Sequence, residues 1–311
     1  MIYTSNRGLL TTIALLSAVT LAACAAQASS TLTPAPTVAP AATLRPPPTA
    51  TPSSPWKLLW SDEFDGPRDA PPDSARWKFD VGGGGWGNRE RQFYTSGPTN
   101  AGLDGDGALV ITARKTTPLQ ARDTLCWYGD CGYTSARLQT SETFTFTYGR
   151  VEARMRLPQG QGLWPAFWML GADIRSNPWP GNGEIDIMEN VGKDPETVVG
   201  TIHGPGYSGG KGIGLRYFQP EGKAFHEAFH VYAVDWRPDE IRWSVDQTTY
   251  FTATPALLPS DTRWVFDHPF FILLNLAVGG QWPGDPDDTT VFPQMLTIDY
   301  VRVYEANSAG R

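Results

Sequence analysis

Basic side chains, cysteine and long apolar runs are all scarce in this chain of 311 residues. Lys and Arg number 25 against 32 Asp and Glu, which excludes a protein that tracks nucleic-acid phosphates with basic side chains. The 3 Cys allow at most one disulfide. No uncharged apolar run reaches the about 20 residues that span a bilayer. Hydrophobic residues nevertheless make up 41%, enough for a sizeable core, and all 12 Trp lie at or after Trp56.

The N-terminal segment has the pattern of an export signal. Arg7 is followed by residues 9–23, an uncharged apolar stretch that fits the core of a signal peptide. It ends in LAAC, which resembles the bacterial lipoprotein signal, where cleavage takes place before a lipid-carrying Cys. We expect removal of residues 1–23 and a lipid on Cys24 as the sole membrane contact, at the bacterial cell envelope or cell surface. An ordinary cleavage site beside an incidental Cys is the alternative.

A spacer of biased composition follows the signal. Pro, Ala, Thr and Ser make up 26 of the 31 residues in 25–55, and Arg45 is the one charged residue there. Such a segment buries too little apolar area to offset its ordering entropy. We therefore expect residues 24–55 to be a tether and residues 56–311 to be one folded domain.

Two further cysteines, Cys126 and Cys131, stand in the short segment CWYGDC. Exported proteins meet oxidising conditions, so we expect a local disulfide, with a free buried pair as the alternative. A zinc site is not expected, because the spacing and the partner ligands are missing.

From Trp56 onward, apolar residues recur at every second position and helical periodicity hardly appears. Residues 151–157, 241–245 and 298–304 alternate in this way, and residues 270–276 are almost continuously apolar. Gly- and Pro-rich turn signals separate these segments. Many short strands without intervening helices indicate an all-β fold, an antiparallel sandwich.

The segment GEIDIMEN around Asp186 is the most informative in the chain. In a regular strand Glu184 and Asp186 share one face and Glu189 points to the other. One extra residue bulged out near Ile187 or Met188 returns Glu189 to the acidic face. The two Glu then stand about four strand steps apart, roughly 13 Å between Cα atoms. Their side chains can lean toward the ~5–5.5 Å separation of a retaining glycosidase pair.

Three carboxylates crowded on one face cannot all ionise near neutral pH. Repulsion holds one protonated while another stays ionised, which is the division that acid–base catalysis requires. Their titration belongs to the cluster and not to single residues. Spacing alone also allows a solvated outer face of the sheet or a cation site.

Five motifs occur in an order typical of one family. They are GLWPAFWML (162–170), GEIDIME (183–189), GTIHG (200–204), VYAVDW (231–236) and DYVRVY (299–304). Together they resemble glycoside hydrolase family 16, and within it the bacterial laminarinases, which are endo-β-1,3-glucanases. The resemblance runs from about Trp60 to Tyr304. It implies a concanavalin-like β-jelly-roll with a concave sugar-binding cleft, residues 56–311 being the catalytic domain of a retaining β-1,3-glucan hydrolase.

The resemblance also implies roles for single residues. Glu184 falls at the position of the nucleophile, Glu189 at that of the general acid/base and Asp186 at that of the assisting carboxylate. His203 matches a histidine near the cleaved bond, with a core histidine as the alternative. No cofactor is implied for catalysis.

Aromatic residues match the family's cleft. Trp164 and Trp168 lie four apart, so an extended strand puts both on one face, and flat aromatics suit the apolar faces of sugars. Core packing is the alternative that spacing leaves open. The resemblance places both in the cleft, together with Asn88, Arg137 and Trp282.

A structural calcium ion away from the cleft is implied as well. The matching positions are Glu63 and Gly107, largely through backbone carbonyls, and the carboxylate of Asp299, since oxygen ligands suit Ca²⁺. A monomer is the simplest expectation for the oligomeric state.

Three other functions compete with this one. HEAFH at residues 226–230 fits a zinc-protease signature, but that motif requires a helix and here runs into a strand pattern. A non-catalytic sugar-binding lipoprotein would lack one of the carboxylates, and all three are present. Among hydrolases, mixed-linkage β-glucan or a galactan is the alternative substrate.

Overall fold

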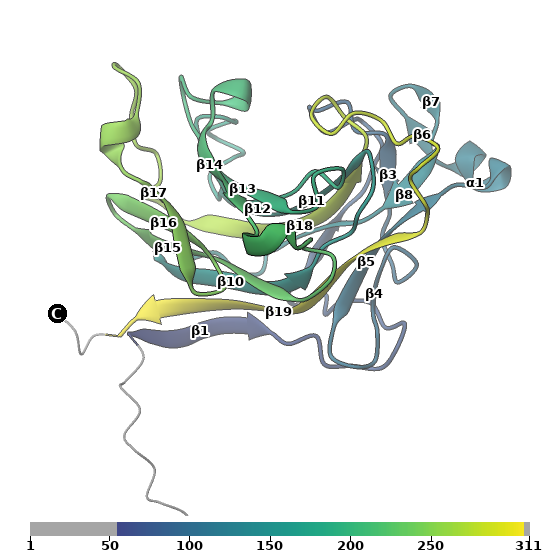
Figure 1. Cartoon of the computed structure of the whole chain (residues 1–311), viewed down its shortest axis with the longest axis horizontal. Coiled ribbons are helices and arrows are strands. Elements are labelled where there is room, and N and C mark those ends of the chain that lie inside the picture. Colours follow the sequence, from purple (N-terminus) through teal and green to yellow (C-terminus); the bar gives the residue numbers. More distant parts are fainter. Residues whose placement is uncertain (1–54, 308–311) are drawn as a thin grey trace, which may run out of the picture. The chain divides into compact units, whose positions relative to one another are not determined.

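The computed structural model describes residues 55–307. The expected signal peptide, Cys24 and the tether up to residue 54 lie outside the described residues. Within them, strands dominate and the single α-helix, α1 (Pro118–Asp123), is one short turn begun by a Thr117–Gln120 capping box. None of the described helices is long and apolar enough to cross a membrane. The prediction of an all-β sandwich is confirmed (Figure 1).

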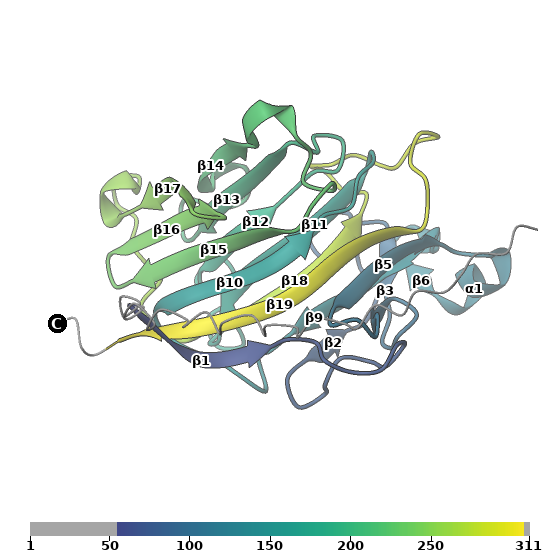
Figure 2. The same cartoon turned by 60° about the horizontal axis from the view of Figure 1, so that its bottom comes forward.

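The larger sheet has ten strands, and all of its pairings are antiparallel except β3 with β8. Figure 2 shows the long β19 crossing the middle of this sheet. From edge to edge its strands are β17 (Thr248–Ala253), β16 (Glu240–Val245), β15 (His230–Arg237), β10 (Gly149–Arg156), β19 (Gln294–Ala306), β5 (Leu109–Lys115), β8 (Tyr133–Ser135) and β3 (Gln92–Tyr94), with β1 (Trp56–Asp62) paired to β19 and β4 (Ala101–Leu103) paired to β5.

The smaller sheet has seven antiparallel strands and lies over the larger one in Figure 1. Its strands, in spatial order, are β14 (Ile213–Phe218), β13 (Thr197–His203), β12 (Glu184–Glu189), β11 (Leu163–Gly171), β18 (Phe270–Val278), β9 (Arg137–Gln139) and β2 (Lys78–Asp80). The connections contain the hairpin β6 (Leu125–Cys126) and β7 (Gly129–Asp130) and three 3₁₀ turns, η1 (Gly209–Lys211), η2 (Pro220–Gly222) and η3 (Pro255–Leu257).

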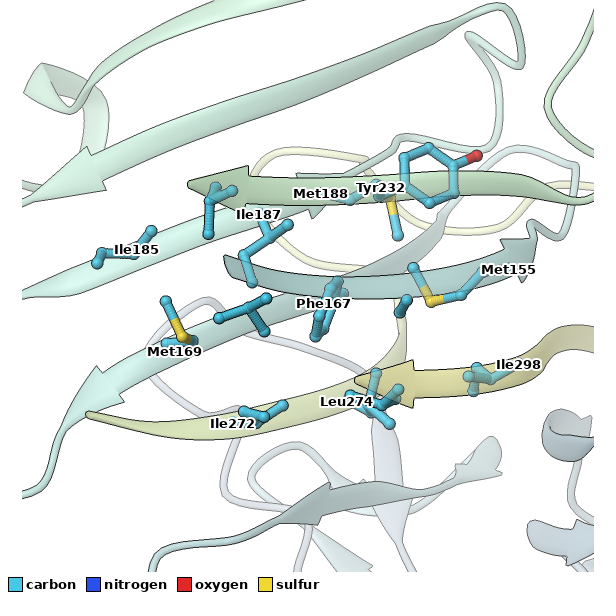
Figure 3. Packing of buried hydrophobic residues seen from close by; sticks show 14 of the residues in the cluster. Met155, Phe167, Met169, Ile185, Ile187, Met188, Tyr232, Ile272, Leu274 and Ile298 are labelled. Carbon is cyan, nitrogen blue, oxygen red and sulfur yellow. The ribbon is translucent and has the colours of Figure 1, made fainter. Parts of the chain in front are cut away.

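The core fills the space between the two sheets. Met155 and Ile298 from the larger sheet and Phe167 from the smaller one are buried there (Figure 3). The larger sheet's contribution includes Val151, Ala153, Met155 and Leu157, the alternating apolar set that the sequence predicts for residues 151–157. β18 is buried along its whole length, because residues such as Leu273 on its other face pack with Trp168 in a second small cluster. The nearly continuous apolar run in this strand thus reflects cover on both faces.

One predicted alternation is interrupted. In β19, Tyr300 pairs with Arg154 while Ile298 pairs with Met155, so Asp299 is bulged out of the ladder. The bulge resets the alternation, and Ile298 and Val301 both reach the core although three positions separate them.

The structure joins Cys126 and Cys131 in a disulfide with an S–S length of 2.06 Å and Cα atoms 5.1 Å apart. The bond closes the β6–β7 hairpin. Next to it, the Trp127 indole N–H donates to the Glu90 carbonyl at 2.8 Å, which fastens the hairpin to the segment that holds Asn88.

Candidate active site

Strand β12 carries the three predicted carboxylates on the free face of the smaller sheet. From Asp186 to Glu189 it advances three residues while its partner β13 advances two, from Thr201 to Val199. The predicted bulge is therefore present. Ile187 and Met188, adjacent in the chain, both point into the core (Figure 3), so that Glu189 returns to the face of Glu184 and Asp186.

Gly183 starts this strand in a conformation that side chains rarely adopt. Its φ is +73°, and a Cβ would come within 3.0 Å of Val265 and 3.1 Å of Phe270. A glycine at this position lets the chain turn tightly into β12 with Glu184 as the first strand residue.

His203 faces the carboxylates from the neighbouring strand, opposite Glu184 in the backbone register. Its Nε2 lies 3.2 Å from Asp186 Oδ2 and 3.7 Å from Glu184 Oε1. The core-histidine alternative is therefore wrong. At the other end of the bulge, the Trp164 indole N–H donates to Glu189 Oε1 at 2.9 Å. One potential ligand atom from each of Glu184, Asp186 and His203 lies within 4.8 Å of the other two, so this group is compact enough to hold a cation.

Burial raises the pKa values of all three carboxyl groups. It raises the pKa of Glu189 to about 8, with repulsion by Asp186 adding to the rise and with His203 and the Trp164 hydrogen bond opposing it. Burial alone raises the pKa of Asp186 to about 8. Burial, followed by the charge of Asp186, holds the pKa of Glu184 well above its usual range. The cluster thus retains protons at neutral pH that isolated carboxylates would release. The main cause is burial, and the repulsion that the sequence suggested adds to it only at Glu184 and Glu189.

An open cleft of about 730 Å³ lies over this strand. Its walls combine carboxylates, indole rings and glycine backbone, a mixture that suits sugars with apolar faces and polar rims. It is lined by Asn88, Trp164, Trp179, Glu184, Glu189, Val199, Thr201, His203, Gly209, Gly210, Gly212, Gly214, Leu215, Arg216, Gln281 and Trp282. Six of the predicted site residues are in this set.

Two predicted cleft residues, Arg137 and Trp168, are not among the residues that line this cavity. The guanidinium of Arg137 sits 4.8 Å from the ring centres of both Trp86 and Trp168, and it pairs with Asp80 at 2.9 Å. The Trp168 indole N–H donates to Asn275 at 2.7 Å. These contacts hold the side chains of Arg137 and Trp168 in place beside the cleft.

A chain of hydrogen bonds continues from Asn275, the partner of Trp168, to Asn88. Asn275 donates to the Tyr94 hydroxyl, which donates to the buried carboxylate of Glu90 at 3.0 Å. Asn88 in turn donates to Glu90 at 3.3 Å, and its carbonyl accepts the Gln281 backbone N–H at 2.9 Å. Burial raises the pKa of Glu90. The network therefore connects the loop of Trp282 to the sheet.

Sequence reasoning missed Trp179, Arg216 and Gln281, which line the cleft from three different segments. Trp179 is 45% exposed and lies 6.4 Å from His203 between ring centres. Arg216 stands opposite Val199, which stands opposite Glu189, so the three form a row across the strands. The alternation of residues in β14 predicts which neighbours share a face with Arg216. It does not predict that this face of the strand borders the cleft.

The three predicted calcium ligands lie on β19 or on segments next to strands that pair with it. β1 ends with Asp62 opposite Val301 and β5 begins with Leu109 opposite Ile298, so Asp299 lies in the gap between them. Glu63 follows β1 and Gly107 precedes β5.

The Glu63 carboxylate makes two hydrogen bonds to Arg302, at 2.9 and 2.7 Å, which leaves its backbone carbonyl as a ligand. Arg154 donates a hydrogen bond to Oδ2 of Asp299 at 2.7 Å, so Oδ1 is the oxygen of this carboxylate that we assign as the ligand. Carbonyl and carboxylate oxygens are the kind of ligand that suits a hard cation such as Ca²⁺.

The HEAFH segment does not form a zinc site of the protease type. Residues 226–228 form a turn and bends, and His230 begins β15, where its Nδ1 lies 3.0 Å from Asp246. The helix that the motif requires is absent from this segment, so the prediction of a strand here is confirmed.

A family model described as glycosyl hydrolases family 16 matches residues 89–302. The chain belongs to this family. A Beta-glucanase of Rhodothermus marinus is 45% identical over 258 residues, which cover 80% of this chain and 85% of that protein.

Solved structures of family 16 relatives have the same fold. The laminarinase catalytic domain of Thermotoga maritima is 48% identical with a TM-score of 0.75, covering 81% of this chain and 99% of that one. An endo-β-1,3-glucanase of Pyrococcus furiosus is also 48% identical, with a TM-score of 0.74 and coverage of 81% and 95%. The family 16 jelly-roll predicted from the motifs is confirmed.

Proposed function

We propose that the protein is a retaining endo-β-1,3-glucanase that cleaves laminarin-type glucan by double displacement. The observation that carries this function is the bulge in β12, which sets Glu184 and Glu189 on one face of an open cleft with Asp186 between them. The kinship with laminarinases supports β-1,3-linked glucan as the substrate.

In the first step Glu184 attacks the anomeric carbon while Glu189 protonates the leaving glycosidic oxygen. Glu189 enters this step protonated, because burial raises its pKa to about 8. Asp186 lies between the two and, when protonated, donates a hydrogen bond that favours the ionised form of Glu184. His203, 3.2 Å from Asp186, orients that carboxyl group.

In the second step Glu189, now ionised, takes a proton from a water molecule that attacks the glycosyl-enzyme, and Glu184 leaves with its charge restored. The configuration at the anomeric carbon is therefore retained. Trp164 donates to Glu189 at 2.9 Å, and this bond strengthens as Glu189 becomes an anion. The edge-to-face pair of Trp164 and Trp282 offers a platform for the adjoining sugar.

Release of reducing sugar by the purified protein tests this function. Laminarin, mixed-linkage β-glucan and agarose are compared, with Glu184→Ala as the control. Release from laminarin above the other two, lost in the variant, is the expected result. Preferred release from agarose or mixed-linkage glucan would favour the other hydrolase, and binding of laminarin without release would favour a sugar-binding protein.

We further propose a structural Ca²⁺ at Glu63, Gly107 and Asp299. Bound calcium stabilises the folded state alone, so about 100 Kd of Ca²⁺ raises the melting temperature by about 5 °C. Asp299→Ala abolishes the rise because it removes the side-chain oxygen, whereas Glu63→Gln keeps it because the backbone carbonyl is unchanged. Melting curves with Ca²⁺ and with chelator measure this, and a rise that survives Asp299→Ala contradicts the site.

The anchor at Cys24 and a monomeric state in the cell envelope complete the proposal. Cys24→Ser leaves no thiol for the lipid, so we expect the protein to move from the membrane fraction to the soluble fraction. Fractionation after expression in a bacterium measures this. Retention of Cys24→Ser in the membrane would contradict the lipid anchor.

A further inference from the structure

Trp243 reaches from the larger sheet across the core to the catalytic strand. It lies on β16 and is fully buried. Its indole N–H donates to the backbone carbonyl of Asp186 at 2.7 Å. A side chain of one sheet thus holds the backbone of the other at the residue between the two catalytic Glu.

The carbonyl that Trp243 binds is at the start of the bulge. Pairing with β13 is regular up to Asp186 and resumes at Glu189, so the ladder is interrupted at this point. Asp186 is buried, and a carbonyl buried without a donor costs free energy. The Trp243 indole supplies that donor from below the sheet.

The approach of the indole depends on the strand beside β12. Gly200 of β13 lies over the ring, and a Cβ there would come within 2.3 Å of Trp243 Cδ1 and 2.6 Å of the Tyr250 hydroxyl. Phe251 flanks the same ring, with centres 4.9 Å apart. Glycine at 200 and the aromatic neighbours therefore fix the position of the indole N–H.

We propose that Trp243 is a positioning residue, whose hydrogen bond holds the β12 bulge in the form that aims Glu189 at the glycosidic oxygen. The inference rests on the proposed function, because Glu189 is there the general acid/base. Catalytic groups displaced by about 1 Å can lose as much as about 100-fold in rate. Loss of the indole N–H therefore lowers kcat while substrate contacts, and with them KM, stay nearly unchanged.

Trp243→Phe removes the N–H and keeps an aromatic ring in the core. Trp236→Phe is the matched control, because Trp236 is equally buried on the neighbouring β15 and its indole donates to the Phe266 carbonyl at 3.0 Å and not to the backbone of β12. Both variants lose one buried hydrogen bond, and we expect similar drops in melting temperature. We expect kcat on laminarin to fall about tenfold or more in Trp243→Phe and less than twofold in Trp236→Phe.

A substrate with a better leaving group distinguishes a misplaced Glu189 from a general loss of stability in the variant. An aryl β-glycoside of a laminari-oligosaccharide needs little protonation of its leaving group, so the Trp243→Phe defect in the first step shrinks on it. Equal loss of kcat in both variants, or the same loss on aryl glycoside and laminarin, overturns the proposal. If Trp243→Phe does not fold, Gly200→Ala displaces the indole without removing it, and normal kcat in that variant also overturns it. Inactive wild-type protein would refute the proposed function, whereas active wild-type protein with unchanged kcat in Trp243→Phe would refute the role of Trp243 alone.

Discussion

Glu184→Ala lowers kcat on laminarin by about 10⁴-fold or more, because no other group on β12 can replace the nucleophile. The variant stays folded, since it removes a carboxyl group whose pKa is raised first by burial and then by the charge of Asp186, both of which oppose its ionised form in the folded state. Its melting temperature is therefore equal to that of the wild type or higher. Initial rates and thermal unfolding on the same preparation measure both effects.

A small anion identifies the lost group as the nucleophile. Azide or formate enters the space of the missing carboxylate and attacks the anomeric carbon, so part of the activity returns with an inverted product. Glu142→Ala is the control, since Glu142 is an exposed carboxylate paired with Arg175 outside the cleft. A Glu184→Ala enzyme that keeps near-wild-type rate would remove Glu184 from this role.

Glu189→Gln lowers kcat on laminarin by about 10²–10⁴-fold, the usual contribution of a general acid/base. The pH dependence follows from the pKa of Glu189, which burial raises to about 8. Below that pH Glu189 holds the proton that the leaving oxygen needs, and above it the rate falls about tenfold per pH unit. The basic limb of the wild-type pH profile is therefore near pH 8, and it is missing in Glu189→Gln.

The raised pKa of Glu189 also makes the free energy of unfolding depend on pH. The folded state binds a proton at Glu189 between its ordinary pKa of 4.5 and about 8, whereas the unfolded state releases it. This group's contribution to stability therefore decreases as pH rises through that window. Glu189→Gln removes this contribution to the pH dependence of stability.

An aryl glycoside with a good leaving group restores the first step in the Glu189→Gln variant. Equal loss of kcat on the aryl glycoside and on laminarin would contradict the role of Glu189 as the acid.

The position of Glu189 was predictable because a strand alternates with a period of two. Glu184 and Glu189 differ by an odd number, so a shared face requires one extra residue, and the pairing with β13 contains it. Trp164 followed from the same rule, and its hydrogen bond to Glu189 confirms the shared face. Local periodicity thus determined the fold class and which residues of β11 and β12 face the cleft.

Contacts between distant segments were beyond this reasoning. Trp243 looks in the sequence like any core aromatic of an alternating strand, and its bond to the Asp186 carbonyl depends on how the two sheets stack. Trp179 and Gln281 reach the cleft from loops that have no periodicity. The bulge at Asp299 was likewise invisible, because its place in β19 is set by pairing with β10.

The bulge in β12 also acts as a register lock. A strand that slipped by one residue would turn Ile187 and Met188 out of the core and lose their buried area, so β12 has one low-energy alignment with its neighbours. Since all three carboxylates lie on this one strand, their spacing does not depend on a hinge between separate parts of the chain. Evolution or engineering can therefore alter the rim of the molecule, and with it substrate range or thermal tolerance, without dispersing the reactive groups.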